Sequence, residues 1–131
     1  MDLPFTDDSF DVVVCQFGVM FFPDRAGAFA EVRRVLRPGG TFVFNVWDRI
    51  EANDFTATVV DALGELFPAD PPVFLASVAH GYHDPDVIRA DLAAGGFTTR
   101  AVIEGIDAMS RASSCDAPAF GFCQGSPMRN S

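Results

Sequence analysis

The sequence predicts an α/β fold in which parallel strands are covered by helices, and three observations indicate it. Residues 10–17 (FDVVVCQF) are almost continuously apolar and β-branched, which is typical of a strand buried on both faces. A helix is predicted over 25–36, because Asp24 is a typical N-cap and the Pro-Gly-Gly at 38–40 stops a helix. Residues 41–47 (TFVFNVW) are a second predicted buried strand. Strand, helix and strand within about 40 residues indicate a right-handed parallel crossover.

After this crossover the prediction is mainly helical. Asp54 and Asp84 are each expected to cap a helix, and Pro85 suits the first helical position. The predicted elements are a helix over 55–67, a helix from 85 to about 94 that ends at Gly95-Gly96, a third strand over 97–103 (FTTRAVI) and a short helix over 117–124.

Composition and charge limit the class of protein. The 131 residues are 49% hydrophobic and 21% charged, as in a globular domain. The chain has no Lys and a net charge of −9, so we expect no grip on a nucleic acid backbone. No apolar run reaches the roughly 20 residues that span a bilayer, so we expect no membrane partner.

The cysteines and the first residues indicate the compartment. Cys15, Cys115 and Cys123 are scattered and form neither a CxxC pair nor a disulfide framework. The acidic start MDLPFTDD lacks the basic-then-apolar pattern of a signal peptide. We therefore expect a reduced, cytoplasmic protein.

Four segments together resemble a known family. They are LPF at 3–5, FDVV at 10–13, RVLRPGG at 34–40 and NVWD at 45–48. In this order and separation they resemble the class I S-adenosylmethionine-dependent methyltransferases, in the group called methyltransferase type 11. HGYHDP at 80–85 and GFCQGSP at 121–127 resemble one bacterial branch of that family, so the resemblance covers nearly the whole chain.

The resemblance implies a partial, doubly wound, Rossmann-like sheet with parallel strands and flanking helices, from which the N-terminal strands are missing. In the family, three strands and a glycine-rich G-x-G-x-G loop precede the segment seen here, and a final strand follows it. The main loop that binds S-adenosylmethionine is therefore expected to be absent from this chain. Gly39 and Gly40 do not replace it, because they end a helix, whereas the loop must follow a strand and open a helix.

On this basis residues 1–131 are expected to form one incomplete methyltransferase-like domain. Its expected parts are a strand–helix–strand core over 10–47, a helical and substrate-side segment over 54–94, the third strand over 97–103 and a tail over 104–131.

The candidate cofactor-binding residues follow the first strand. In an open α/β sheet, ligands bind beyond the carboxyl ends of the strands. Cys15, Gln16, Phe17 and Gly18 occupy that edge, and the resemblance implies that they lie against the methionine part of the cofactor. Simple packing between a strand and a loop is the alternative interpretation.

Four further residues are candidates for contact with the substrate. Asn45 and Trp47 end the second strand at the same edge, and His80 and His83 are the two histidines of the chain. The alternatives are strand closure for the first two and loop packing for the histidines. A metal pair is disfavoured, because no third ligand lies nearby in the sequence.

No catalytic acid or base is assigned, because methyl transfer by this fold depends mainly on alignment. Asp11 is expected to pin the entry of the first strand. The arginines at 33, 34 and 37 are expected to form a solvated face.

Two functions from different classes remain open. In the intact family the activity is methyl transfer from S-adenosylmethionine to a small molecule, and this chain is expected to be a truncated and inactive fragment. The alternative is a non-catalytic interaction or dimerisation domain. It rests on the edge of strand 10–17, which is expected to lack its neighbour and to pair with a second copy or a partner chain. A dehydrogenase remnant is disfavoured, since the chain has no nicotinamide fingerprint.

Overall fold

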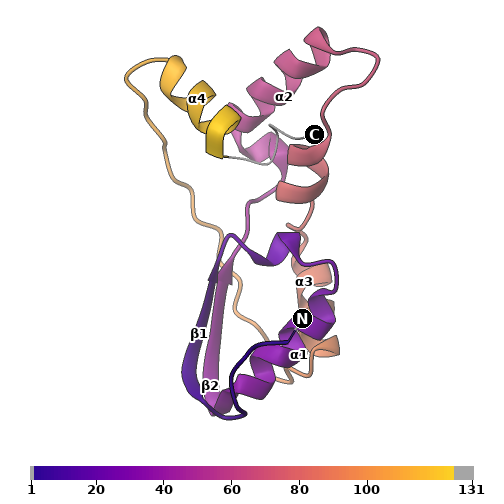
Figure 1. Ribbon diagram of the computed structural model, residues 1–131, viewed down its shortest axis with the longest axis vertical. Coiled ribbons are helices and arrows are strands. Elements are labelled where there is room, and N and C mark those ends of the chain that lie inside the picture. Colours follow the sequence, from indigo (N-terminus) through magenta and orange to yellow (C-terminus); the bar gives the residue numbers. More distant parts are fainter. Residues whose placement is uncertain (1, 126–131) are drawn as a thin grey trace.

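A computed structural model describes residues 2–125 as a two-stranded parallel sheet with helices (Figure 1). The elements are β1 Phe10–Gln16, the 3₁₀ turn η1 Val19–Phe21, α1 Arg25–Val35, β2 Leu36–Asn45, the 3₁₀ turn η2 Ile50–Ala52, α2 Asp54–Leu66, the π-helical turn η3 Leu75–Ala79, α3 Pro85–Ala94 and α4 Asp116–Gly125. The expectation of an α/β fold with a parallel strand–helix–strand unit is confirmed.

The sheet is regular only over its second half. β1 and β2 are parallel, and their register runs from Val12 opposite Thr41 to Gln16 opposite Asn45. Phe10 lies opposite Leu36, so the four residues 37–40 form an irregular excursion in β2. The prediction that Pro-Gly-Gly ends the helix was wrong in position: α1 ends at Val35 and the chain turns at once into β2.

Gly39 allows the backbone to adopt the irregular conformation of residues 37–40. Its φ of +81° lies in the left-handed region that favours glycine. The sequence correctly indicated a positive φ at this position. The residue lies in a bulge within β2, however, and not at the end of a helix.

One face of the sheet carries the hydrophobic core. α1 and α3 pack together over this face, and the Phe29 ring lies 5.6 Å from the rings of both Phe42 and Phe44. Asp24 caps α1 by accepting from the Gly27 backbone nitrogen, as predicted. The buried cluster consists of Val19, Met20, Phe29, Tyr82, Ile88 and Leu92.

The other face of the sheet is open. Val12, Val14 and Val43 point to it and are 54%, 67% and 49% exposed. The prediction that residues 10–17 are buried on both faces was therefore wrong. The physical reason is that the helices of the described chain cover one side only, so the side chains alternate between core and solvent.

The predicted third strand over 97–103 is not observed. Phe97 packs into the core, with its ring 5.8 Å from that of Phe42, but the residues that follow make no strand pairing. Val102 and Ile106 are each 86% exposed. The β-branched residues favour an extended strand, but a strand forms only where a second strand pairs with it. Within residues 2–125 no strand pairs with this segment.

The remaining helices agree with prediction in place and differ in detail. α2 begins at Asp54 itself, and the N-cap is Asn53, which makes no side-chain capping bond. Asp84 caps α3 by accepting from the Asp86 backbone nitrogen, as predicted. α4 matches the short helix predicted over 117–124, whereas the end of the predicted tail, 126–131, lies outside the described residues. In the described chain no helix is both long and apolar enough to cross a bilayer.

Arg34 of α1 binds the N-terminal segment, residues 3–9. The Arg34 guanidinium donates to the carbonyl oxygens of Leu3 and Phe5 at 3.1 and 2.9 Å and to the carboxylates of Asp7 and Glu31 at 2.7 to 2.9 Å. The prediction of a solvated arginine face was therefore wrong at position 34, because the segment over 3–9 folds back on this residue.

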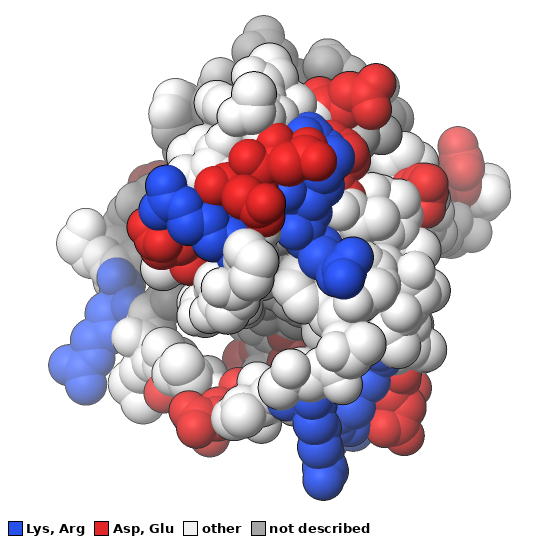
Figure 2. Space-filling view, turned by 90° about the horizontal axis from the view of Figure 1, so that it is seen from below, with Lys and Arg blue, Asp and Glu red and all other residues white. Residues whose placement is uncertain are grey.

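Asp11 has the structural role that was predicted. Its two carboxylate oxygens accept from Arg37 Nη1 at 2.9 and 2.8 Å, at the point where β1 begins. Figure 2 shows acidic and basic side chains interleaved on the face seen from below, so that face carries no patch of one sign.

Candidate functional site

The carboxyl end of β1 is closed by a contact with β2. Phe17 has a φ of +48°, which is uncommon for a residue other than glycine. Its backbone nitrogen donates to Asn45 Oδ1 at 2.8 Å. A strained backbone conformation persists only where its surroundings hold it, and Asn45 is the residue that does so here.

Three aromatic rings from separate segments meet beside this contact. The Phe17 ring stacks on Trp47 with centroids 4.2 Å apart and planes inclined by 15°. Trp47 also approaches His80, at 6.0 Å between ring centroids. Trp47 is 43% exposed and His80 is 4% exposed. We call Phe17, Trp47 and His80 the aromatic rim.

The imidazole of His80 is held by one backbone carbonyl and lies near the side chain of Asn53. Its Nδ1 lies 2.7 Å from the carbonyl oxygen of Asp48, to which it donates, and 3.4 Å from the amide nitrogen of Asn53. His83 is linked to the same place, because its Nδ1 donates to the His80 carbonyl oxygen at 2.8 Å. The fold therefore brings Asn45, Trp47, His80 and His83 together near the end of β1.

The four candidate cofactor residues separate into different environments. Phe17 belongs to the aromatic rim, and Gln16 is exposed. Cys15 is half-buried against the core, and a Cβ at Gly18 would lie 2.7 Å from its Sγ. Gly18 is thus explained by close packing. Whether these residues contact a cofactor stays a prediction.

The residues present do not by themselves fit S-adenosylmethionine. The Phe17 backbone N–H, which points from the strand end, already donates to Asn45. Within the described chain, β1 is followed by a three-residue 3₁₀ turn and not by a glycine-rich loop that opens a helix. The rim offers an aromatic wall and the Gln16 amide, but it offers no backbone cradle for the methionine part of the cofactor.

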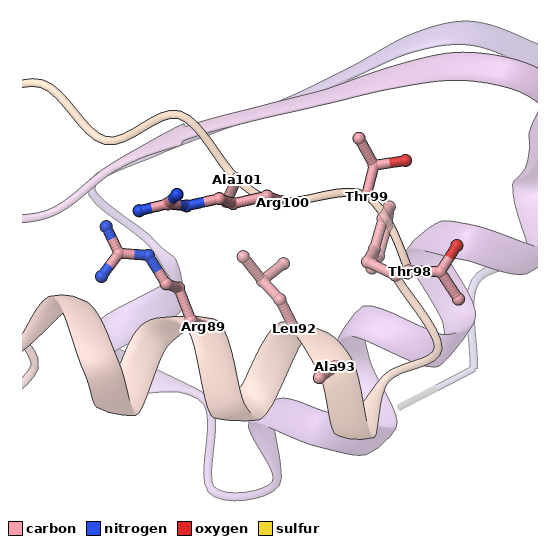
Figure 3. Close-up of a pocket in the computed structure, with 8 residues that line it drawn as sticks. Arg89, Leu92, Ala93, Thr98, Thr99, Arg100 and Ala101 are labelled. Atoms are coloured by element: carbon pink, nitrogen blue, oxygen red, sulfur yellow. The ribbon is translucent and has the colours of Figure 1, made fainter.

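A separate pocket lies between α3 and the segment after it (Figure 3). It encloses about 190 Å³, with Leu92 and Phe97 among its apolar walls and Arg89 and Arg100 at its border. Arg89 pairs with Asp86 at 3.0 Å. The pocket shares no lining residue with the aromatic rim, and no sequence motif indicated it.

A buried tyrosine was also missed by sequence reasoning. Tyr82 is 2% exposed, donates to Asp91 Oδ2 at 2.9 Å and lies under the Arg25 guanidinium, 4.1 Å from its ring centroid. Burial, and then the hydrogen bond to Asp91, raise the pKa of Tyr82. These contacts join α1 to α3 below the aromatic rim. Only the spacing of Tyr82 and Asp91 across the α3 cap could have indicated them.

The histidines do not form a metal centre with other residues of the described chain. No group of three or more His, Cys, Asp or Glu side chains in residues 2–125 is placed to hold a metal ion.

Comparison with known proteins identifies the first third of the chain. Residues 1–44 match the family described as Methyltransferase domain. This segment is methyltransferase-domain sequence. It comprises β1, α1 and most of β2, the unit whose carboxyl edge carries the aromatic rim.

Three curated relatives match parts of the chain, and two of them are named as methyltransferases. An uncharacterised protein of Mycobacterium tuberculosis is 53% identical over 45 residues, which are 34% of this chain and 16% of that protein. A demethylmenaquinone methyltransferase of Bacillus velezensis is 51% identical over 43 residues, 33% of this chain and 18% of the relative. A ubiquinone/menaquinone biosynthesis C-methyltransferase of Burkholderia cenocepacia is 32% identical over 102 residues, 72% of this chain and 42% of the relative.

The chain spans less than half the length of each of these relatives. No solved structure matches it. The methyltransferase-domain segment is therefore established from sequence, and the chemistry of the whole protein is a matter for proposal.

Proposed function

We propose that this chain supplies the acceptor side of a site that transfers a methyl group from S-adenosylmethionine to a small cyclic molecule. The observation that carries the proposal is the aromatic rim, which lies where the methyltransferase-domain segment ends. The Bacillus relative is named as a demethylmenaquinone methyltransferase and the Burkholderia relative as a ubiquinone/menaquinone biosynthesis C-methyltransferase, so a quinone precursor is the proposed acceptor class.

The rim suits a flat ring as its ligand. One face of Trp47 is occupied by Phe17, and with 43% of the side chain exposed the indole still offers apolar surface. Aromatic rings prefer offset-stacked or edge-to-face contacts at 4.5–7 Å. The Trp47 indole N–H is suited to donate a hydrogen bond to a ring oxygen, and His80, which is only 4% exposed, packs near Trp47.

The donor side of the site must come from outside the described residues, since these make no cradle for the cofactor. In this proposal Gln16 and Phe17 form one wall of the donor site, and a glycine-rich loop outside residues 1–131 completes it. The isolated chain is therefore inactive. Its free thiols, Cys15 and Cys115, fit a reducing cytoplasm.

A chimera tests this proposal. The part of the Burkholderia relative that precedes its matched stretch is fused ahead of residue 1, and methyl transfer from S-adenosylmethionine to a demethylated naphthoquinol is measured. We expect activity in the chimera and none in the chain alone. A folded chimera that binds donor and acceptor but transfers no methyl group would contradict the proposal.

Two variants of the chimera separate the acceptor wall from the rest of the protein. Trp47→Ala is expected to raise KM for the acceptor while leaving the affinity for S-adenosylhomocysteine unchanged. Val102→Ala is the matched control, because this side chain is 86% exposed and lies outside the rim. An equal change in the KM for the acceptor in both variants would show that the aromatic rim does not contact the acceptor.

A second function is favoured by one specific observation. Within residues 2–125 one face of the sheet is open and one edge of β1 pairs with no strand, which suits completion of the sheet by another chain. A non-catalytic interaction domain would use that surface and would need no cofactor. Absence of activity in a folded chimera, together with stable self-association of the chain, would favour this function.

A further inference from the structure

Arg25, the first residue of α1, links two segments that lead to the aromatic rim. Its Nη2 donates to the carbonyl oxygen of Met20 at 3.1 Å, in the η1 turn that follows Phe17. Its guanidinium carbon lies 4.1 Å from the centroid of the Tyr82 ring, and Tyr82 follows His80 by two residues. Arg25 therefore contacts both the segment that leads from Phe17 and the segment that leads from His80.

The turn that contains His80 and Tyr82 is compact. His83 Nδ1 donates to the carbonyl oxygen of His80 at 2.8 Å and closes the turn. A Cβ at Gly81 would meet the carbonyl oxygen of Ser77, so the turn packs closely against η3. Because closely packed groups transmit displacements to one another, a shift of Tyr82 is expected to shift His80 as well.

The buried Tyr82 side chain is held at two places, and only one of them reaches the end of β1. Its hydroxyl donates to Asp91 Oδ2 at 2.9 Å, but Asp91 lies on α3, which directly follows the turn. Arg25 comes from α1 and is bonded to η1, so it is the contact that relates the turn to the end of β1. Mutation can therefore separate the two contacts.

The guanidinium of Arg25 is kept in place at a cost. Its Nε is buried and makes no hydrogen bond within residues 2–125. A buried donor without a partner disfavours the folded state and calls for an explanation other than packing. An aliphatic side chain would avoid this cost, but it would make neither the cation–π contact with Tyr82 nor the hydrogen bond to Met20.

We propose that Arg25 is a positioning residue for the aromatic rim. Through Tyr82 and the compact turn it holds His80, and the buried His80 ring supports the exposed indole of Trp47. Arg25 itself does not touch the acceptor. Its part in binding the acceptor rests on the proposed function, whereas its effect on the position of Trp47 does not.

Quenching of Trp47 fluorescence by acrylamide tests this role in the full chain without methyl transfer. Trp47 is the only tryptophan of the chain and is 43% exposed. Arg25→Met keeps the aliphatic stem but removes the charge and the donors, so the indole loses support and its quenching constant is expected to rise. Arg25→Lys keeps a cation for the Tyr82 ring and is expected to recover part of the difference.

Matched controls separate this link from general effects of substitution. Arg33→Met removes the same charge from an exposed position on α1 and is expected to leave the quenching constant unchanged. Tyr82→Phe keeps the ring under Arg25 and loses only the hydrogen bond to Asp91, so it is also expected to leave the constant unchanged. Circular dichroism confirms that each variant is folded. If Arg25→Met does not fold, Arg25→Gln takes its place, since it keeps a donor for Met20 but no cation.

The same variants in the chimera test the part that Arg25 plays in binding the acceptor. Because small misplacements of a binding group weaken its contacts, Arg25→Met is expected to raise the KM for the acceptor by about threefold to tenfold. The affinity for S-adenosylhomocysteine is expected to stay unchanged. A chimera without methyl transfer would contradict the proposed function but not the link from Arg25 to Trp47, which the quenching constant measures.

The quenching constants decide the role of Arg25. An unchanged constant in Arg25→Met, an equal rise in Arg33→Met, or no recovery in Arg25→Lys would each overturn the proposal. A rise in Tyr82→Phe as large as that in Arg25→Met would overturn it too, because Asp91 and not Arg25 would then hold the turn.

Discussion

Asn45 Oδ1 lies 2.8 Å from the backbone nitrogen of Phe17 and holds that residue at a φ of +48°. The contact joins the carboxyl ends of the two strands and turns the Phe17 ring onto Trp47. It thereby builds the part of the aromatic rim that the proposed acceptor would touch. Loss of this hydrogen bond is therefore expected to change both the free energy of unfolding and the fluorescence of Trp47.

Asn45→Ala is expected to destabilise the fold by about 0.5–1.5 kcal/mol, because it removes an exposed hydrogen bond that holds Phe17 in a strained backbone conformation. Trp47 is the only tryptophan of the chain, so urea denaturation followed by its fluorescence reports on this site. The emission of the folded variant is expected to shift to the red as the stacking loosens. Asn45→Asp keeps an acceptor oxygen and serves as the matched control. Equal losses in the two variants would mean that the hydrogen bond does not hold Phe17.

Tyr82 is expected to resist ionisation in the folded protein. Burial raises its pKa, and the hydrogen bond to Asp91 adds to the effect. Because the folded pKa lies above the unfolded one, the free energy of unfolding falls as pH rises past about 10. Tyr82 is the only tyrosine of the chain, so the absorbance of the ionised phenol measures it without interference.

Asp91→Asn removes the carboxylate and is expected to lower the pKa of Tyr82 while leaving it above the ordinary value, since burial remains. Asp86→Asn, a change at an exposed position on the same helix, is the control and should leave the titration unaltered. Ionisation of Tyr82 near pH 10 in the folded protein would contradict the buried hydrogen bond.

Glu31 is expected to contribute to stability above pH 4.5. Hydrogen bonds from Arg34 and from the Leu3 backbone lower its pKa from 4.5 to about 2. A depressed folded pKa stabilises the protein above the unfolded value, and this stabilisation is lost as pH falls toward about 2. The difference in unfolding free energy between the protein and Glu31→Gln should therefore shrink over that range.

Urea titrations at a series of pH values measure the difference. Glu65→Gln is the control, because Glu65 is exposed on α2 and far along the chain from the N-terminal segment. A Glu31→Gln difference that stays constant with pH would show that the carboxylate is not held by Arg34.

Elements fixed by local chemistry could be predicted from the sequence. Asp24 and Asp84 each have a backbone N–H within reach once a helix starts, so the N-caps of α1 and α3 agree with the structure. β1 was found because a run of β-branched residues is itself the signal. Asp11 was placed at the entry of β1 for the same reason, as the one charge in an apolar run.

Features that depend on distant partners could not be predicted. The β-branched residues over 97–103 signal a strand, but no neighbour is present to pair with them. The glycine at 39 signals positive φ without saying whether a helix or a strand contains it. The exposure of Val12 and Val14 depends on how many helices cover the sheet, which no local pattern records.

The candidate site was predictable in part for the same reason. Asn45 and Trp47 were found because strands of a parallel sheet end at one edge, and His80 joins them there. Cys15 shared the sequence signal but packs against the core, since side chains alternate along a strand. Tyr82 was missed, because its partners Arg25 and Asp91 come from two different helices and only its spacing from Asp91 is visible in the sequence.

The most direct test of the account is a calorimetric titration with S-adenosylhomocysteine, performed on the chain alone and on the chimera that carries the N-terminal part of the Burkholderia relative. We predict no heat of binding with the chain, and saturable one-to-one binding with the chimera. Saturable binding to the isolated chain would contradict the conclusion that its rim lacks a cradle for the cofactor. A folded chimera that gives no heat of binding would contradict the proposal that this chain forms part of a methyl-transfer site.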